Sequence, residues 1–172
     1  MKKQLYVMVG SPGLGKSTWI KNHLINFDGI ARVISRDDIR FHLVKPDEDY
    51  FSKENQVFNE YIENLKLTLH DCDSTIADAT HLNEDSRNKL LRALGTSLKD
   101  VEINAIVIKG SLDTALERNE NRAGTRSYVP RSVVQRMWHQ QTMPSLEEGF
   151  DKIYIYQSDK IGIKYTIIER DK

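Results

Sequence analysis

The chain has 172 residues, a length that suits one domain with a sizeable core. Its 25 lysines and arginines balance 25 aspartates and glutamates, so no overall field draws it onto nucleic acid or an anionic membrane, and a polyanion would need a local patch. A single cysteine, Cys72, excludes an intrachain disulfide and a cysteine-based metal site. No apolar run approaches the length of a membrane span, so we expect a cytoplasmic protein without membrane contact.

The first predicted elements surround a glycine-rich segment. Residues 4–9 form a short apolar run typical of a strand, and residues 18–25 have the pattern of a helix. Between them stands the sequence GSPGLGKS, which matches G-x-x-x-x-G-K-[ST] at all four fixed positions. This context predicts a phosphate-binding loop. The alternative, a plain glycine-rich turn, is disfavoured because every fixed position matches.

Such a loop binds nucleotides mainly through its backbone. Its glycines let successive N–H groups turn toward a di- or triphosphate, and the helix N-terminus behind them adds partial positive charge. Lys16 is predicted to reach the β- and γ-phosphates of ATP, and Ser17 to ligate Mg²⁺. The predicted ATP-binding residues of this segment are Gly10, Ser11, Pro12, Gly13, Leu14, Gly15, Lys16, Ser17 and Thr18.

The rest of the chain alternates short apolar runs with amphipathic segments. Strands are predicted at residues 31–35, 74–78, 101–108, 152–156 and 164–168, and helices at 51–69, 83–98, from 113 onward and at 131–143, with a polar connector over 121–130. This alternation predicts one α/β domain over the whole chain, with a mainly parallel sheet covered by helices on both faces. The last two strands are expected to pair as an antiparallel edge hairpin because their connection is short and polar.

An acidic residue and a basic residue follow the predicted strand at 31–35. Asp37 lies at the edge where open α/β sheets bind ligands, so its carboxylate could accept a proton from an attacking hydroxyl. Arg40, three residues later, would lie on the same side of a helical turn and hold an anion on the incoming substrate. The alternative is that Asp37 or Asp38 caps a helix and Arg40 is a solvated charge.

Arginines gather in and beside the polar connector. Arg118, Arg122 and Arg126 are spaced four residues apart. The segment from about 119 to 131 could therefore act as a lid that closes over a bound triphosphate and neutralises charge during phosphoryl transfer. An ordinary solvated basic face is the alternative.

Polar residues also follow the predicted strand at 74–78. Asp78 ends this strand, where it could assist magnesium, orient a lid arginine or touch the acceptor, and the sequence does not rank these roles. Thr80 belongs to the same segment. His81 is expected to be a surface or hydrogen-bonded histidine rather than a catalyst, and Asn83 is a candidate N-cap of the next helix.

Taken together, these motifs resemble the kinase domain of phage-type polynucleotide 5′-hydroxyl kinases. The matching pieces are in that family's order and cover roughly residues 1–145. They are the N-terminal MKK, residues 10–19, the sequence SRDDIR at 35–40, Asp78 with Leu82 and Asn83, Arg118 and Asn119 through Arg122, Gly124 with Thr125, and Val129 with Pro130. The resemblance implies a P-loop kinase fold with a basic lid.

The resemblance also implies an activity, which is transfer of the γ-phosphoryl group of ATP, with Mg²⁺, to the 5′-hydroxyl end of DNA or RNA. Asp37 would be the general base, and Arg40 would contact the phosphate on the 3′ side of the acceptor nucleotide. The complete set of predicted roles is Asp37, Lys16, Arg122 and Arg118 as catalytic residues, Arg122 and Arg126 as further ATP contacts, Arg40, Asp78 and Thr80 as acceptor contacts, and Ser17 as metal ligand. Several family members form oligomers and carry a 3′-phosphatase domain. The resemblance therefore allows a homo-oligomer, although the sequence does not give the oligomeric state, and no such second domain is expected within these residues.

Three departures from the family's pattern leave the acceptor and the pairing of individual arginines open. They are Ala123 between Arg122 and Gly124, the extra Arg126, and one additional residue between Asp78 and Asn83. Two other functions remain in competition. One is a P-loop kinase of a small hydroxylated molecule, such as a sugar, nucleoside or antibiotic, and the other is a noncatalytic nucleotide-binding module or switch.

Overall fold

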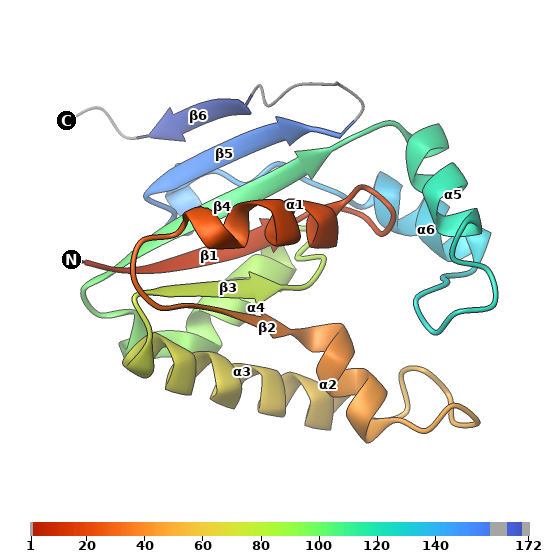
Figure 1. The fold of residues 1–172 in the computed structure, drawn as a ribbon, viewed down its shortest axis with the longest axis horizontal. Coiled ribbons are helices and arrows are strands. Elements are labelled where there is room, and N and C mark those ends of the chain that lie inside the picture. The colour runs from red at the N-terminus through yellow and green to blue at the C-terminus, as the bar shows by residue number, and fades with distance from the viewer. Residues whose placement is uncertain (1, 159–164, 170–172) are drawn as a thin grey trace.

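The computed structural model of the chain describes residues 2–158 and 165–169, within which six strands form one sheet in the order β2-β3-β1-β4-β5-β6 (Figure 1). The strands are β1 (Lys3–Val9), β2 (Ala31–Ser35), β3 (Ser74–Asp78), β4 (Val101–Lys109), β5 (Lys152–Gln157) and β6 (Tyr165–Glu169). The first five run parallel, and β6 is antiparallel to β5 at the edge. The predicted mainly parallel sheet with an antiparallel edge hairpin is therefore confirmed.

Helices cover both faces of this sheet, as predicted. They are α1 (Lys16–His23), α2 (Arg36–Leu43), α3 (Glu54–Asp71), α4 (Glu84–Leu94), α5 (Leu112–Glu120) and α6 (Arg131–His139), with the short 3-10 helices η1 (Leu24–Asn26), η2 (Gly95–Leu98) and η3 (Leu146–Glu148). One hydrophobic cluster joins the sheet to α3 and α4, and a second joins its other face to α1, α5 and α6. The arrangement is that of a P-loop kinase fold.

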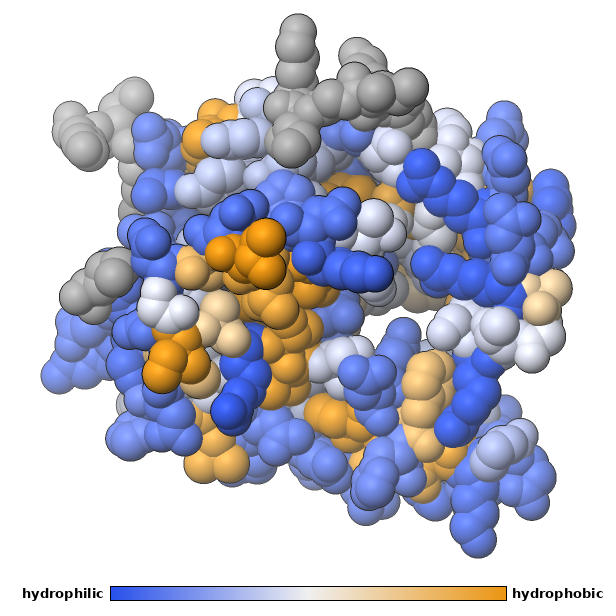
Figure 2. Space-filling view, in the orientation of Figure 1, coloured by the Kyte–Doolittle hydropathy of each residue, from blue (hydrophilic) through white to orange (hydrophobic). Residues whose placement is uncertain are grey.

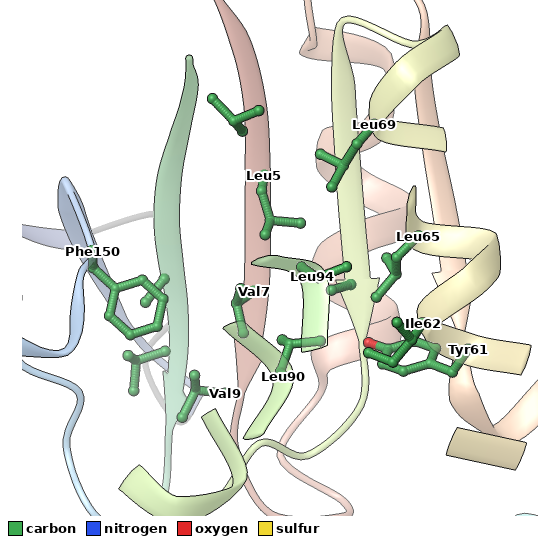
Figure 3. Packing of buried hydrophobic residues seen from close by; sticks show 14 of the residues in the cluster. Leu5, Val7, Val9, Tyr61, Ile62, Leu65, Leu69, Leu90, Leu94 and Phe150 are labelled. Carbon is green, nitrogen blue, oxygen red and sulfur yellow. The ribbon is translucent and has the colours of Figure 1, made fainter. Parts of the chain in front are cut away.

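The two clusters follow from strand geometry, because successive side chains of a strand point to opposite faces. In β1, Leu5 and Val7 pack with Tyr61 of α3 and Leu90 of α4 (Figure 3). Met8, which follows Val7, belongs to the cluster on the α1 face. All five side chains are at most 1% exposed. The apolar run of the first strand is therefore buried on both sides, as in parallel sheets generally.

Helix α2 was not predicted from the sequence, and several helix boundaries differ from the prediction, most clearly those of α3 and α6. The helix expected from residue 51 begins at Glu54, and the helix expected to reach residue 143 ends at His139. The early end has a tertiary cause, since the Thr142 N–H donates to the Leu82 carbonyl oxygen at 2.9 Å instead of continuing the helix. The predicted N-cap is confirmed, because the Asn83 side chain accepts the N–H of the third helical residue of α4.

The C-terminal hairpin pairs β5 with β6. The strand expected at 164–168 corresponds to β6, and its first expected residue, Lys164, lies outside the described residues. None of the helices in the described part of the chain is long and apolar enough to cross a lipid bilayer.

Candidate active site

The predicted phosphate loop joins β1 to α1 at the carboxyl edge of the sheet (Figure 1). Gly13 has a φ of +83°, and a Cβ atom on it would lie 2.4 Å from the Ala115 carbonyl oxygen of α5. Gly15, with a φ of 101°, is the N-cap of α1. Both backbone conformations favour glycine, and at Gly13 the neighbouring backbone leaves no room for a side chain. The loop therefore depends on its glycines for shape as well as for close packing.

Lys16 lies within this loop. Its Nζ donates to the carbonyl oxygens of Gly10 at 2.7 Å and Ser11 at 3.0 Å. Ser17 and Thr18 follow in the first turn of α1, and both side chains are exposed. The ammonium group and the two hydroxyl groups are thus collected at one helix N-terminus, where an anion would bind favourably.

Several charged residues from other elements act on Lys16. Burial lowers the pKa of Lys16 to about 8, while attraction by Asp78 and Asp37 raises it and repulsion by Arg122 lowers it. Burial likewise raises the pKa of Asp78 to about 6, against the attraction of Lys16. These residues come together because parallel strands β1, β2 and β3 end at the same edge of the sheet.

Asp37 is in the first turn of α2, and its side chain is 61% exposed. The N-cap of this helix is Ser35, whose hydroxyl accepts the Asp38 N–H at 3.3 Å. Capping, the alternative role considered for the two aspartates, is therefore supplied by Ser35. The Asp37 Oδ1 atom instead accepts hydrogen bonds from Arg40 at 2.6 Å and from the Tyr50 hydroxyl at 2.9 Å.

Arg40 is not a solvated charge, because its side chain is only 6% exposed. One guanidinium nitrogen contacts Asp37, and the other donates to Glu54 Oε2 at 2.8 Å. The guanidinium carbon lies 4.5 Å from the centre of the Tyr50 ring, within the range of a cation–π interaction. An anion on a substrate could bind Arg40 only by competing with these two carboxylates.

The arginines of the predicted lid take three different positions. Because α5 ends at Glu120, Arg122 follows in a turn rather than on the same helix as Arg118. Both nevertheless line a hollow of about 450 Å³ beside the phosphate loop, together with Trp19 and Tyr156. Arg118 also donates to the Leu14 carbonyl oxygen at 3.3 Å, which ties it directly to the loop.

Arg126 is directed away from the phosphate loop. Its two terminal nitrogens donate to the carbonyl oxygens of Phe41 at 2.9 Å and Val44 at 2.7 Å, and its guanidinium lies over the Phe41 ring. These carbonyls are at the C-terminus of α2, the negative end of the helix dipole, which favours a cation. An ATP contact by Arg126 would require the lid to release α2.

An opening separates the start of α2 from the phosphate loop and the lid, and mostly hydrophilic residues surround it (Figure 2). Thr80 contributes to the loop side through its backbone, because its carbonyl oxygen accepts the Gly10 N–H at 3.0 Å. His81 is buried, and its Nδ1 lies 2.7 Å from the Met8 carbonyl oxygen. Burial lowers the pKa of His81 to about 4, so the ring is neutral at pH 7 and is a hydrogen-bonded structural histidine, as expected.

Three buried or braced side chains were not anticipated in the sequence. Asn119 bonds both the N–H and the carbonyl oxygen of Val129, at 3.0 and 2.7 Å, and so joins the two ends of the lid. Arg87 is completely buried and forms an ion pair with Glu148 at 2.6 Å. Gln141 contacts the phosphate loop. Only Asn119 had a local signal, its place beside Arg118 in the family resemblance.

A family model described as an AAA domain (AAA_33) matches residues 5–144 of the chain. This range begins in β1, ends after α6 and contains every predicted site residue.

Several solved structures share the fold. The chain is similar to Pnkp1 in a Pnkp1/Rnl/Hen1 RNA repair complex, with a TM-score of 0.62 and 22% identity over 81% of this chain and 44% of that one. It is similar to a protein provisionally described as a kinase from Chloroflexus aurantiacus, with a TM-score of 0.72 and 16% identity over 92% of this chain and 89% of that one. It is also similar to a gluconokinase from Sinorhizobium meliloti 1021, with a TM-score of 0.58 and 16% identity over 92% of this chain and 84% of that one. The chain thus spans less than half of the Pnkp1 chain, and at these identities the likeness is one of fold.

Proposed function

Because this chain belongs to the AAA-domain family and has a P-loop kinase fold, we propose that it transfers the γ-phosphoryl group of ATP to the 5′-hydroxyl end of a DNA or RNA strand. The observation that carries the proposal is the exposed carboxylate of Asp37, whose charge acts on Lys16 and which lies at the same sheet edge. A passive nucleotide-binding module requires no such carboxylate beside the transferable phosphate.

The reaction would follow from positioning and charge neutralisation. With ATP in the phosphate loop, Lys16 exchanges the Gly10 and Ser11 carbonyl oxygens for phosphate oxygens. Asp37 orients the acceptor hydroxyl and takes its proton as the new oxygen–phosphorus bond forms and the bond between the β–γ bridging oxygen and the γ-phosphorus breaks, which leaves ADP. Arg122, beside the loop, stabilises the negative charge on the transferred group.

Magnesium is expected to arrive with ATP. Within residues 2–158 and 165–169, no group of three or more histidine, cysteine, aspartate or glutamate side chains could hold a metal ion by itself. Magnesium at a nucleotide site usually takes only one or two protein oxygens, with phosphate and water supplying the rest. The exposed Ser17 hydroxyl at the start of α1 fits that need, and Mg²⁺ would supply further charge neutralisation when bound.

The surroundings of Asp37 favour an acceptor with a planar ring. Tyr50 and Phe51 are 37% and 57% exposed, and their ring centres lie 4.8 Å apart. The Tyr50 hydroxyl contacts Asp37 directly. Exposed aromatic rings bind nucleobases by stacking with little dependence on sequence. A nucleotide at a strand end would therefore find a stacking surface next to the proposed base.

A kinase of a small hydroxylated molecule is the second candidate. Arg40 is already neutralised by Asp37 and Glu54, so an acceptor that carries a phosphate must displace one of these carboxylates. A neutral sugar, nucleoside or antibiotic does not have to do so.

The discriminating experiment is transfer of label from [γ-³²P]ATP to a 5′-hydroxyl oligonucleotide or to a pool of small alcohols that includes gluconate, sugars and nucleosides. Asp37→Ala should lower transfer to the oligonucleotide by about 10²- to 10⁴-fold. Asp38→Ala, at the neighbouring exposed carboxylate, is the matched control. Labelling of the pool alone would favour the second candidate. Nucleotide binding that is lost in Lys16→Ala, without transfer of label to either acceptor by the wild type, would indicate a noncatalytic module. Unchanged turnover in Asp37→Ala would show that Asp37 is not the base.

A further inference from the structure

Gln141 makes a contact to the phosphate loop across 130 residues of sequence. It lies between α6 and η3, and its side-chain oxygen Oε1 accepts two hydrogen bonds from Ser11. One comes from the Ser11 backbone N–H at 3.0 Å and the other from the Ser11 hydroxyl at 3.2 Å. Both donors belong to Ser11, the second residue of the loop, which is separated from the end of β1 at Val9 by Gly10 alone.

The geometry of a peptide bond connects this contact to Lys16. The Ser11 N–H and the Gly10 carbonyl group belong to one peptide unit, which is planar and trans, so the two groups point in opposite directions. Gln141 binds the N–H end, and Lys16 Nζ binds the carbonyl oxygen at 2.7 Å. If this unit rotates, the oxygen that holds the lysine rotates with it.

We propose that Gln141 is a positioning residue that fixes the Gly10–Ser11 peptide unit and, through it, holds the Lys16 ammonium group ready for the phosphates of the nucleotide. The proposal rests only on the nucleotide-binding half of the proposed function. The nature of the acceptor does not enter it.

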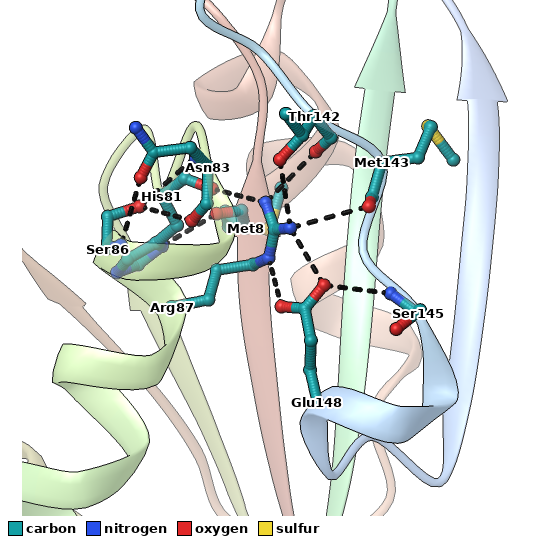
Figure 4. Close-up of polar contacts among 9 residues, drawn as sticks. All are labelled: Met8, His81, Asn83, Ser86, Arg87, Thr142, Met143, Ser145 and Glu148. Atoms are coloured by element: carbon teal, nitrogen blue, oxygen red, sulfur yellow. Dashed lines mark hydrogen bonds and ion pairs between the residues drawn. The ribbon is translucent and has the colours of Figure 1, made fainter.

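The segment that carries Gln141 is itself held in place by buried contacts. Next to Gln141, the Thr142 N–H donates to Leu82 at 2.9 Å, and the Thr142 carbonyl oxygen accepts from Arg87 at 3.0 Å. Arg87 also donates to the carbonyl oxygens of Met143 at 3.4 Å and His81 at 3.2 Å (Figure 4). The backbone that follows the glutamine therefore has little freedom.

The charge of Arg87 is balanced by Glu148 of η3. The Arg87 Nε atom donates to Oε2 at 2.6 Å, and Nη2 donates to Oε1 at 2.9 Å, a bidentate pair (Figure 4). The two side chains are 0% and 4% exposed. Glu148 Oε1 additionally accepts the Ser145 N–H at 3.0 Å. Because a buried arginine must satisfy its donors, this network has one favoured arrangement, and that arrangement presents Gln141 to the loop.

The test replaces the accepting oxygen while keeping the volume of the side chain. Gln141→Leu should weaken ADP and ATP binding about tenfold by calorimetry, and should lower kcat/KM for ATP by a similar factor. The acceptor KM should stay close to that of the wild type, whereas the melting temperature should fall by a few degrees because the buried Ser11 N–H loses its acceptor. Gln140→Leu, at the exposed neighbouring glutamine, is the matched control and should bind nucleotide normally.

A double-mutant cycle separates positioning from simple packing. Ser11→Ala removes one of the two donors and should weaken nucleotide binding less than Gln141→Leu does. In the background of Gln141→Leu, adding Ser11→Ala should cause little further loss, because the shared acceptor is already gone.

Two results would overturn the proposal. One is nucleotide binding by Gln141→Leu within twofold of the wild type, and the other is full additivity of the two substitutions. Since ADP binding needs no acceptor, either result can be distinguished from failure of the proposed 5′-hydroxyl kinase activity, which the label-transfer experiment measures.

Discussion

The proposed donor side and the proposed acceptor side of the candidate active site are held together in different ways. On the donor side, Lys16 contacts carbonyl oxygens, and a neutral glutamine braces the loop. On the acceptor side, Arg40 is paired with Asp37 and Glu54. Carbonyl oxygens can be exchanged for phosphates at little cost, whereas an ion pair must be broken before its members act on a substrate. The comparison indicates that the donor side is preorganised and the acceptor side must rearrange.

The largest effect is expected from removing the charge on the donor side. Lys16→Met should lower phosphoryl transfer by about a thousandfold or more, because the cation that meets the β- and γ-phosphates is lost. The measurement is label transfer at saturating ATP. Lys21→Met, an exposed lysine on the same helix, should have normal activity. A loss of less than tenfold in Lys16→Met would remove the basis for calling the donor side preorganised.

The buried ion pair between Arg87 and Glu148 should contribute strongly to the stability of the fold. Arg87→Met should lower the free energy of unfolding by about 3–5 kcal/mol, because the Glu148 carboxylate is left buried and unpaired. Urea denaturation measures the change. The double substitution Arg87→Met with Glu148→Leu should regain part of the loss. If the single and double variants were equally unstable, the ion pair would not be the source of the effect.

His81, which bonds the Met8 carbonyl oxygen of β1, makes the stability of the fold depend on pH. Burial lowers the pKa of His81 from 6.5 to about 4. Between these two values the unfolded chain binds a proton at this histidine and the folded chain does not. Stability is thus lost as pH falls through this window, by about 2 kcal/mol between pH 7 and 5. His81→Asn, which tolerates the observed φ of 39°, should flatten the dependence. The free energy of unfolding is measured by urea denaturation at several pH values. An equal dependence on pH in the two proteins would contradict this.

The smallest effect is expected from Arg40, and it tests the proposed acceptor side. Arg40→Ala should raise the acceptor KM about tenfold and leave the ATP KM within twofold, because a charged hydrogen bond to the acceptor is lost. Arg32→Ala, at an exposed arginine on β2, is the control. A fall in kcat at unchanged acceptor KM would instead mean that Arg40 only orients Asp37. Equal rises in both KM values would contradict any role specific to the acceptor.

The sequence by itself determined the order of the strands and of every α-helix except α2, the mainly parallel sheet, the phosphate loop and the cap at Asn83. Each depends on local signals, such as the alternation of apolar residues, the spacing of glycines and one capping side chain. Asp37 could be proposed as the base for the same reason, since it lies two residues beyond the end of a predicted strand. Its ion pair with Arg40 fits their spacing of three residues.

Only the tertiary structure decided which distant partners the charged and polar groups find. Arg126 has the spacing of a lid arginine, yet its guanidinium binds the C-terminus of α2, 82 residues away at Val44. Gln141 contacts Ser11, and Arg87 pairs with Glu148 across 61 residues. No local pattern encodes these contacts, because each depends on which segments the packed sheet and helices bring side by side.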